Sequence, residues 1–279
     1  MKKLHISIMV LLFVAVLAFP IISLISFEKE PNKENINCIL KEQGASVDAA
    51  GKPIYSWGLV RGKNGDIPQV AEPDKELLYK YSGVYLGDTD QNKLYLTFDE
   101  GYENGYTADI LDTLKEKKVK AIFFITGDYL KDSPELVGRM INEGHEIGNH
   151  SMNHYSFATI SGKEVENEIK ELDNKLIELF GKGTYFVRPP KGEFNETSLC
   201  AIEGIGKKCM MWSFAYKDWL PNSQNGSKYA YETIIKNLHS GAIILLHAVS
   251  QDNAQALGDV IDEARKRGFE FGEPQDFMS

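Results

Sequence analysis

From Lys93 to the end of the chain, short apolar segments typical of β-strands alternate with longer segments of helical periodicity. A helix between two strands returns the chain so that the second strand runs parallel to the first. The pattern therefore predicts a parallel α/β fold, either closed into a barrel or laid out as an open sheet. The seven strand candidates are Leu94–Phe98, Ala121–Thr126, Glu146–Asn149, Tyr185–Arg188, Cys209–Phe214, Ala242–His247 and Phe269–Phe271.

The segment 162–180 carries the clearest helix signals. Ser161 precedes it and Glu164 follows three residues later, which is the pattern of a capping box. Its apolar residues recur at helical spacing on one face, namely Val165, Ile169, Leu172, Leu176 and Leu179. Residues 134–143 and 253–267 show similar periodicity, and each is followed by a glycine.

The first segment, residues 1–27, differs from the rest in composition. Lys2 and Lys3 precede an apolar stretch from Ile6 to Phe27. A run of ~20 apolar residues can span a bilayer, and positive charge ahead of it keeps the N-terminus in the cytoplasm. We therefore expect a single-pass membrane anchor with the remainder of the chain outside the cell membrane. A cleaved signal segment, which would make the protein an exported one, is the alternative.

Two segments separate this stretch from the alternating pattern. Residues 28–51 are polar and aperiodic, as in a linker, and residues 52–90 mix aromatic residues with Gly and Pro, as in an irregular N-terminal extension. Residues 91–279 then form the main domain. Nothing in the sequence indicates an oligomeric state.

Charge and cysteine content exclude some classes of function. The formal net charge is −9 and no long basic run occurs, so a nucleic acid is not expected to be the partner. An uncharged or carboxylated polymer stays open as a partner. The three cysteines, Cys38, Cys200 and Cys209, have no CxxC spacing, so neither a disulfide framework nor a cysteine-based zinc site is indicated.

Polar residues mark the ends of the predicted strands. The residues at or just after a C-terminal strand end are Asp99, His150, Arg188, Asp218 and His247. A β/α barrel gathers its catalytic residues on this rim, whereas an open sheet binds ligands chiefly at one switch point. Five such residues from different strands therefore favour the barrel.

Two pairs of residues at these strand ends suggest metal chemistry. His150 and His154 are four residues apart, which suits two ligands of one ion if the backbone between them is helical. Asp99 and Glu100 end an apolar strand, where one carboxylate can act as a ligand and the other as a general base. Solvent-facing turns are the alternative for both pairs. Taken alone, Arg188 is typical of a rigid turn and His247 of a buried core histidine.

Five motifs occur in a fixed order. They are Thr97-Phe-Asp-Glu-Gly101, His150-Ser-Met-Asn-His154, Arg188-Pro-Pro-Lys-Gly192, Lys217-Asp-Trp219 and Leu246-His-Ala-Val-Ser250. Together they resemble the polysaccharide deacetylase family (carbohydrate esterase family 4) over roughly residues 90–273. The resemblance implies a distorted (β/α)7 barrel with residues 91–279 as the catalytic domain. The stretch Phe98–Tyr106 and the pair Trp57-Gly58 are similar to one subgroup, the δ-lactam-biosynthetic N-acetylmuramic acid deacetylases.

The resemblance implies a role for each matching residue. The implied catalytic residues are Asp99 as general base, His247 as general acid, and Arg188 and Asp218 as the groups that orient them. The implied metal ligands are Glu100, His150 and His154. The expected substrate contacts are Trp219, Leu246 and the backbone amide near Lys191. The family pattern has Asp at position 100 and an acidic residue at position 215, where this chain has Glu100 and Ala215.

The implied activity is removal of the N-acetyl group from N-acetylmuramic acid in peptidoglycan, leading to the δ-lactam of spore cortex. A divalent ion polarises the amide carbonyl and lowers the pKa of bound water. Zinc is the first choice, with cobalt, manganese and magnesium as alternatives. One rival function is deacetylation of N-acetylglucosamine in wall glycan or chitin-like oligomers. The other rival is a degenerate family member that binds glycan without cleaving it.

Overall fold

The structure is a computed structural model, and it describes residues 46–47, 53–63 and 65–278. The predicted anchor lies outside the described residues, as does all of the predicted linker except Ser46 and Val47. Within the described part, no helix is both long enough and apolar enough to cross a membrane. The described residues belong to one compact unit within residues 32–279.

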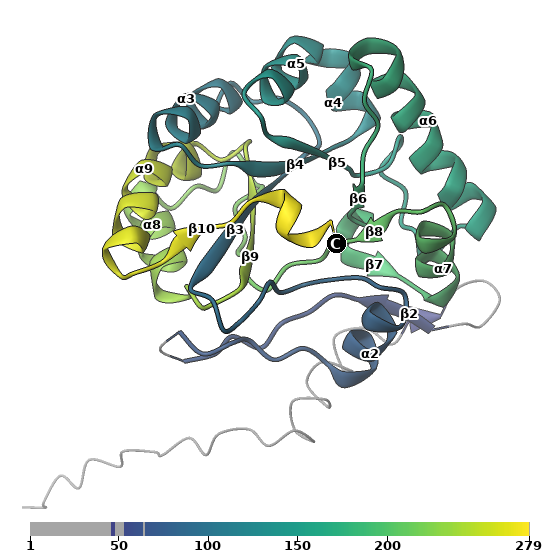
Figure 1. The fold of residues 1–279 in the computed structure, drawn as a ribbon, viewed down its shortest axis with the longest axis horizontal. Coiled ribbons are helices and arrows are strands. Elements are labelled where there is room, and N and C mark those ends of the chain that lie inside the picture. Colours follow the sequence, from purple (N-terminus) through teal and green to yellow (C-terminus); the bar gives the residue numbers. More distant parts are fainter. Residues whose placement is uncertain (1–45, 48–52, 64, 279) are drawn as a thin grey trace, which may run out of the picture. The chain divides into compact units, whose positions relative to one another are not determined.

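A seven-stranded sheet forms the centre of this unit (Figure 1). Its strands are β3 (Lys93–Glu100), β4 (Ala121–Ile125), β5 (Glu146–Asn149), β6 (Phe186–Val187), β8 (Lys208–Cys209), β9 (Ala242–His247) and β10 (Glu270–Phe271). The α-helices are α2 (Glu72–Lys80), α3 (Thr107–Lys117), α4 (Gly127–Asp132), α5 (Pro134–Asn142), α6 (Gly162–Phe180), α7 (Glu196–Gly204), α8 (Ser227–Lys236) and α9 (Gln251–Lys266). Two 3₁₀ turns, η1 (Pro190–Gly192) and η2 (Pro274–Phe277), complete the order.

Every strand pair in the seven-stranded sheet is parallel, so the predicted parallel β/α architecture is confirmed. The order runs β10-β3-β4-β5-β6-β8, and β9 pairs with β3. A single bridge between Phe214 and Ile244 joins the chain beyond β8 to β9. The sheet therefore curls into a distorted barrel, and α3 to α9 lie in an arc outside it (Figure 1).

Helix α6 shows how local sequence sets an element's bounds. The Ser161 hydroxyl accepts a hydrogen bond from the Glu164 amide at 3.3 Å, and the Glu164 carboxylate accepts one from the Ser161 amide at 2.8 Å. The helix ends at Gly181, whose φ of 71° is left-handed. The predicted capping box is thus confirmed. The expected core position of Leu179 is wrong, because Leu179 is exposed and the neighbouring Phe180 packs against the core in its place.

The core lies between the outer helices and the sheet. Strands β3, β4 and β9 are apolar on both faces, and Phe98, Phe123 and Ile244 are at most 1% exposed. Helices α3, α8 and α9 pack their apolar faces against this layer. Each fully buried side chain of this size contributes about 1.5–3 kcal/mol. This rigid layer holds the C-terminal strand ends in place.

The N-terminal extension is attached to the barrel by a small antiparallel sheet. Strand β1 (Ser46–Val47) pairs with β2 (Pro53–Ser56), which pairs with β7 (Glu193–Phe194). The Trp57 amide donates to the Gly192 carbonyl at 2.9 Å, and the Trp57 indole donates to the Trp212 carbonyl at 2.8 Å. The extension therefore braces the turn that follows β6.

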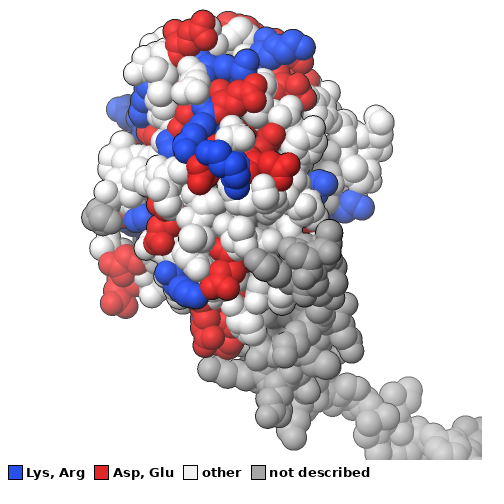
Figure 2. Space-filling view, turned by 90° about the vertical axis from the view of Figure 1, so that its right-hand side faces the viewer, with Lys and Arg blue, Asp and Glu red and all other residues white. Residues whose placement is uncertain are grey.

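Acidic and basic side chains are interspersed on the face shown in Figure 2, which has no continuous basic surface. Helix α6 carries exposed ion pairs, such as those of Glu166 with Lys163 and Lys170. Pairs of this exposed kind contribute little to stability.

Candidate active site

A cavity of about 510 Å³ opens at the C-terminal ends of the strands. Its lining residues are Asp99, His150, His154, Lys191, Gly192, Trp212, Ala215, Tyr216, Lys217, Trp219, Leu245 and His247. Six of the residues singled out in the sequence therefore meet in one place, although they come from loops and strands far apart in the chain. Arg188 and Asp218 do not line the cavity, but they contact residues that do.

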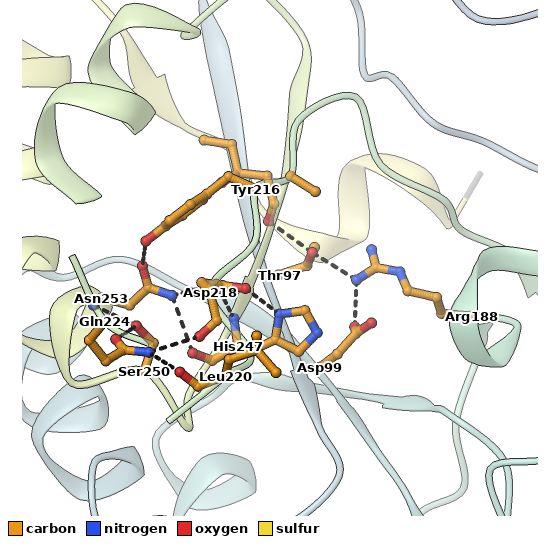
Figure 3. Close-up of polar contacts among 12 residues, drawn as sticks. Thr97, Asp99, Arg188, Tyr216, Asp218, Leu220, Gln224, His247, Ser250 and Asn253 are labelled. Carbon is orange, nitrogen blue, oxygen red and sulfur yellow. Dashed lines mark hydrogen bonds and ion pairs between the residues drawn. The ribbon is translucent and has the colours of Figure 1, made fainter. Parts of the chain in front are cut away.

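Strand register sets the positions of Asp99 and His247. Strand β3 pairs with β9 so that Asp99, one residue before the end of β3, lies directly opposite His247, the last residue of β9. Side chains on paired residues of adjacent strands point to the same face of the sheet. Both groups therefore face the cavity, as the close-up in Figure 3 shows.

Arg188, which does not line the cavity, binds the Asp99 carboxylate and fixes its orientation. One guanidinium nitrogen, Nη1, donates to Asp99 Oδ1 at 2.7 Å and to Thr97 Oγ1 at 3.0 Å (Figure 3). Nε and Nη2 donate to the carbonyls of Met210 and Met211. Burial alone would raise the pKa of Asp99, but the charge of Arg188 outweighs it and lowers the pKa below the usual value. Asp99 is therefore an ionised carboxylate at neutral pH.

Asp218 orients His247 in the same way. Its Oδ1 lies 2.7 Å from His247 Nδ1, and its Oδ2 accepts from the His247 backbone amide at 2.9 Å. Asn253, in the first turn of α9, donates to the same Oδ2 at 2.6 Å. Burial would lower the pKa of His247, but the carboxylate of Asp218 outweighs it and raises the pKa above the usual value. His247 therefore favours the protonated form, with Nε2 free of this contact.

His150 and His154 lie together, but not on a helix as their spacing suggested. The segment after β5 is non-helical, and Ser151 and His154 have left-handed φ values of 72° and 56°. The two imidazole rings lie 5.0 Å apart, centroid to centroid. His150 Nδ1 lies 2.8 Å from the Arg188 carbonyl oxygen, which leaves Nε2 directed at Asp99 Oδ2 at 3.6 Å.

Protein surroundings lower the pKa values of both histidines. Burial in the cleft is the main cause for His150, which is almost fully buried. His154 keeps an exposed edge at the rim, but partial desolvation by the surrounding protein, and then the ring of His150, lower its pKa to about 4. Neutral imidazoles are the form that binds metal ions. The pair therefore fits a divalent ion in donor type and in separation.

The structure does not bring Glu100 to this pair. Strand β3 extends through Glu100, so its side chain and that of Asp99 point to opposite faces. Glu100 does not line the cavity, and its pKa is raised by burial and then by the neighbouring carboxylates Glu103 and Asp99. Among the described residues, no group of three or more His, Cys, Asp or Glu side chains is arranged to hold a metal ion. The expected three-ligand set thus lacks its carboxylate, and Asp99 is the carboxylate nearest His150.

Glu100 is instead buried behind the strand. It is 0% exposed, and neither carboxylate oxygen has a hydrogen-bond partner in the described part of the chain. Tyr129 is close enough for the Glu100 charge to raise its pKa, and the Tyr129 hydroxyl donates to Glu103 at 3.1 Å. Burial raises the pKa of Glu100 well above the usual carboxyl value. A neutral acid in this position costs less than a buried charge.

Replacing Glu100 with glutamine is expected to stabilise the metal-free protein at neutral pH, because the amide stays neutral without binding a proton; each unit by which burial raises the Glu100 pKa is equivalent to about 1.4 kcal/mol. The folded state keeps a proton on Glu100 at pH values where the unfolded chain has released it. The wild-type stability therefore falls as pH rises above the ordinary carboxyl pKa, and Glu100→Gln removes this contribution. Chemical denaturation in chelator at pH 4, 5.5 and 7 measures the growing difference between the two proteins.

Zinc titration of the same variant tests the ligand assignment. We expect Glu100→Gln to bind zinc as tightly as the wild type, whereas His150→Ala should lose affinity. A marked loss of affinity in Glu100→Gln would mean that the carboxylate turns into the cavity when the ion binds.

The structure also moves one substrate contact by a single residue. Leu246 is 0% exposed and belongs to the core, whereas Leu245 lines the cavity. Along β9, Leu245 and His247 share a face and Leu246 points away from it. Trp219 lines the cavity: it is 47% exposed, and its ring lies 5.6 Å from that of His247.

Three contributors have no clear signal in the sequence. Trp212 and Tyr216 line the cavity, and Asn253 bonds both Asp218 and the Tyr216 hydroxyl. They are placed by packing between distant segments. The place of Leu245 in the cavity, by contrast, could have been predicted from the sequence, because residues two apart on a strand, such as Leu245 and His247, share a face.

This chain is similar in sequence to known deacetylases. The sequence model of the family described as "Polysaccharide deacetylase" matches residues 86–210. The Bacillus subtilis peptidoglycan-N-acetylmuramic acid deacetylase PdaA is 41% identical over 241 residues, which is 86% of this chain and 92% of that protein. A Bacillus cereus peptidoglycan-N-acetylglucosamine deacetylase is 34% identical over 181 residues, 63% of this chain and 83% of that protein.

A solved structure resembles most of this chain. It is the structure of Bacillus subtilis PdaA, described as a family 4 carbohydrate esterase, with a TM-score of 0.78 and 42% identity. The match covers 81% of this chain and 97% of that one. The curled parallel sheet is therefore that of a known enzyme family. This chain belongs to the polysaccharide deacetylase family, carbohydrate esterase family 4.

Proposed function

We propose that this protein removes the N-acetyl group from N-acetylmuramic acid in peptidoglycan. The observation that carries the proposal is the paired placement of Asp99 and His247 across β3 and β9, both facing one cavity with His150 and His154. Amide hydrolysis needs a base for the attacking water and an acid for the leaving nitrogen. The similarity to PdaA over most of both chains supports muramic acid as the sugar.

Asp99 is the proposed general base. Its Oδ1 is occupied by Arg188, so Oδ2, on the side of His150, is the atom that takes the proton from water. Arg188 fixes the carboxylate and keeps it ionised. A base held in one orientation costs no reorganisation when the water attacks.

His247 is the proposed general acid. Asp218 binds its Nδ1, so the proton on Nε2 is the one given to the departing amine. The contact with Asp218 raises the pKa of His247, so a proton is available near neutral pH. Trp219, beside the imidazole, and Leu245 form an apolar wall suited to the acetyl methyl group. The backbone amide near Lys191 is the proposed donor to the oxyanion.

His150 and His154 are the proposed metal ligands. A divalent ion bound there would polarise the acetyl carbonyl and lower the pKa of the attacking water. Zinc is the first choice because two neutral imidazoles suit it, with cobalt, manganese and magnesium as alternatives.

Deacetylation of N-acetylglucosamine is the second candidate function. The similarity to the Bacillus cereus enzyme of that specificity favours it, although the match covers less of the chain. A glycan-binding protein without activity is disfavoured, because Asp99, Arg188, Asp218 and His247 form complete bonded pairs. Such pairs serve proton transfer, which binding alone does not require.

We also place the enzyme in its cellular setting. Its substrate lies outside the cell membrane, which agrees with residues 1–27 serving as an anchor or as an export signal. The catalytic domain is proposed to act on the outer side of the membrane on glycan strands. The muramic amine that it exposes is the group needed for δ-lactam formation in spore cortex.

The activity is tested by acetate release from purified glycan strands, with and without a chelator. We expect release by the wild-type protein, loss in chelator and recovery on adding zinc. Mass spectrometry of the digested strands should locate the missing acetyl group on muramic acid. Its location on glucosamine would support the second function, and no release under any condition would contradict both.

A further inference from the structure

Lys191 has a backbone conformation that is unfavourable for any residue with a Cβ atom. Its φ is 61°, in the left-handed region that glycine adopts freely. Of the five described non-glycine residues with positive φ, Ser151, His154 and Lys191 belong to the site, and Ser82 and Lys118 lie elsewhere. Strained residues cluster where their side chains have a function. A glycine would fit position 191 without strain, so the strain points to a need for the lysine side chain.

The turn that carries Lys191 is fixed on both sides. Lys191 lies in η1 directly after Pro189 and Pro190. On the other side, a Cβ atom added to Gly192 would lie 2.7 Å from the Trp212 ring, and the Gly192 carbonyl accepts from the Trp57 amide. The turn therefore presents Lys191 to the cavity from a rigid base.

The charge of Lys191 has no partner in the described part of the chain. Four other charged groups of the site are paired, Asp99 with Arg188 and Asp218 with His247, whereas Lys217 at the cavity, like Lys191, forms no ion pair among the described residues. Lys191 forms no ion pair among the described residues, although it lies near enough to His154 to lower the pKa of that ring. A protein with a net charge of −9 thus keeps an uncompensated cation beside its reaction centre. Such a cation suits an anionic group of the ligand.

The proposed substrate carries such a group next to the reacting amide. Muramic acid differs from glucosamine by a lactyl ether on O3. The adjacent ring carbon, C2, bears the acetamido group. An acetamido group held between Asp99 and His247 therefore places the lactyl group near the cavity wall. Lys191 is on the His154 side of that wall, and Lys217 on the side of Asp218 and Trp219.

We propose that the side chain of Lys191 binds the free lactyl carboxylate and makes the enzyme specific for muramic acid over glucosamine. This inference rests on the proposed function. Lys191 is preferred to Lys217 because the strained, braced turn fixes its position. An amide-blocked lactyl group has no charge for Lys191 to bind, so the enzyme should discriminate against it.

The test compares three substrates with five proteins. The substrates are glycan strands with free lactyl carboxylates, the same strands with the lactyl group converted to a methylamide, and N-acetylglucosamine oligomers. The proteins are wild type, Lys191→Gln, Lys191→Arg, Lys217→Gln and Lys118→Gln. Lys118 is a matched control, because it is also an exposed lysine with a left-handed φ of 55°, in the cap of α3 remote from the cavity.

We expect Lys191→Gln to lower kcat/KM on the free-carboxylate strands about tenfold, mainly through KM, an effect typical of losing one charge-assisted contact. The fold-loss in kcat/KM on the two neutral substrates should be clearly smaller than the loss on the charged strands. Wild-type KM on the charged strands should rise with salt, because screening weakens the contact, and Lys191→Gln should lose this dependence. Lys191→Arg should restore much of the preference, and Lys118→Gln should match wild type.

Two results would overturn the inference. One is an equal loss on charged and neutral substrates, which would mean that Lys191 acts on the reaction or the fold. The other is that Lys191→Gln keeps the wild-type preference for free-carboxylate strands over neutral substrates, whether or not Lys217→Gln loses it. Failure of the wild-type protein to release acetate from any of the three substrates would instead contradict the proposed function.

Discussion

Replacing Asp99 with asparagine is expected to lower kcat/KM for acetate release by about 10²–10⁴-fold, the usual contribution of a positioned general base. Asparagine keeps the shape of the side chain and an oxygen for the 2.7 Å contact with Arg188. It cannot accept a proton from water at neutral pH. The loss should therefore appear in kcat, measured by acetate release at saturating glycan.

Zinc affinity of the same variant separates two roles for this carboxylate. Asp99 Oδ2 lies 3.6 Å from His150 Nε2, so Asp99 is also placed to contact a bound ion. Near wild-type zinc affinity with lost turnover supports the role of base, and lost affinity supports a ligand. Asp132→Asn, at an exposed site on α4, is the control for general effects of removing one charge. Near wild-type turnover in Asp99→Asn would refute both roles.

Replacing Arg188 with methionine is expected to destabilise the fold by about 3–5 kcal/mol, as for other buried pairs that lose one partner. Arg188 is fully buried, and its guanidinium bonds Asp99, Thr97 and two backbone carbonyls. Methionine fills part of the volume but leaves the carboxylate and these carbonyls without their donor. Urea denaturation at pH 7 measures the loss.

The loss should shrink as the pH falls. Without Arg188, the buried Asp99 carboxyl has no charge partner, so burial raises its pKa above that of the unfolded chain. A raised pKa gives stability at low pH that is lost as the pH rises. Arg267→Met, which removes an exposed pair with Glu263, should cost less than about 1 kcal/mol. A similarly small loss in Arg188→Met would show that the buried pair is not needed for folding.

Much of the fold was accessible from local pattern. The seven strands were predicted because β3, β4 and β9 are apolar runs between polar helices, and buried parallel strands have this composition. The gathering of Asp99, His150 and His247 at one rim follows from parallel topology, since the C-terminal ends of parallel strands lie at one edge. The capping box of α6 was visible for the same reason: it depends on residues three apart.

The residues that were misplaced depend on where a strand ends. Glu100 was expected at the metal because of its place in the family motif, but β3 continues through it and turns its side chain away. Leu246 was misplaced by the same alternation, one residue before His247. The bend between His150 and His154 depends on left-handed residues that periodicity does not reveal. Trp212 and Asn253 reach the site through packing between segments that are distant in the sequence, which local sequence patterns do not reveal.

The bracing of the Lys191 turn by Trp57 bears on how this catalytic unit can be exchanged between relatives. The sequence shared across the family begins at residue 86, yet the backbone that supports the turn is bonded to a residue almost thirty positions earlier. A chimera joined at residue 86 would inherit the cleft from one parent and its support from the other. Modules of this family are therefore best cut before β2, so that the cleft and its brace are inherited together.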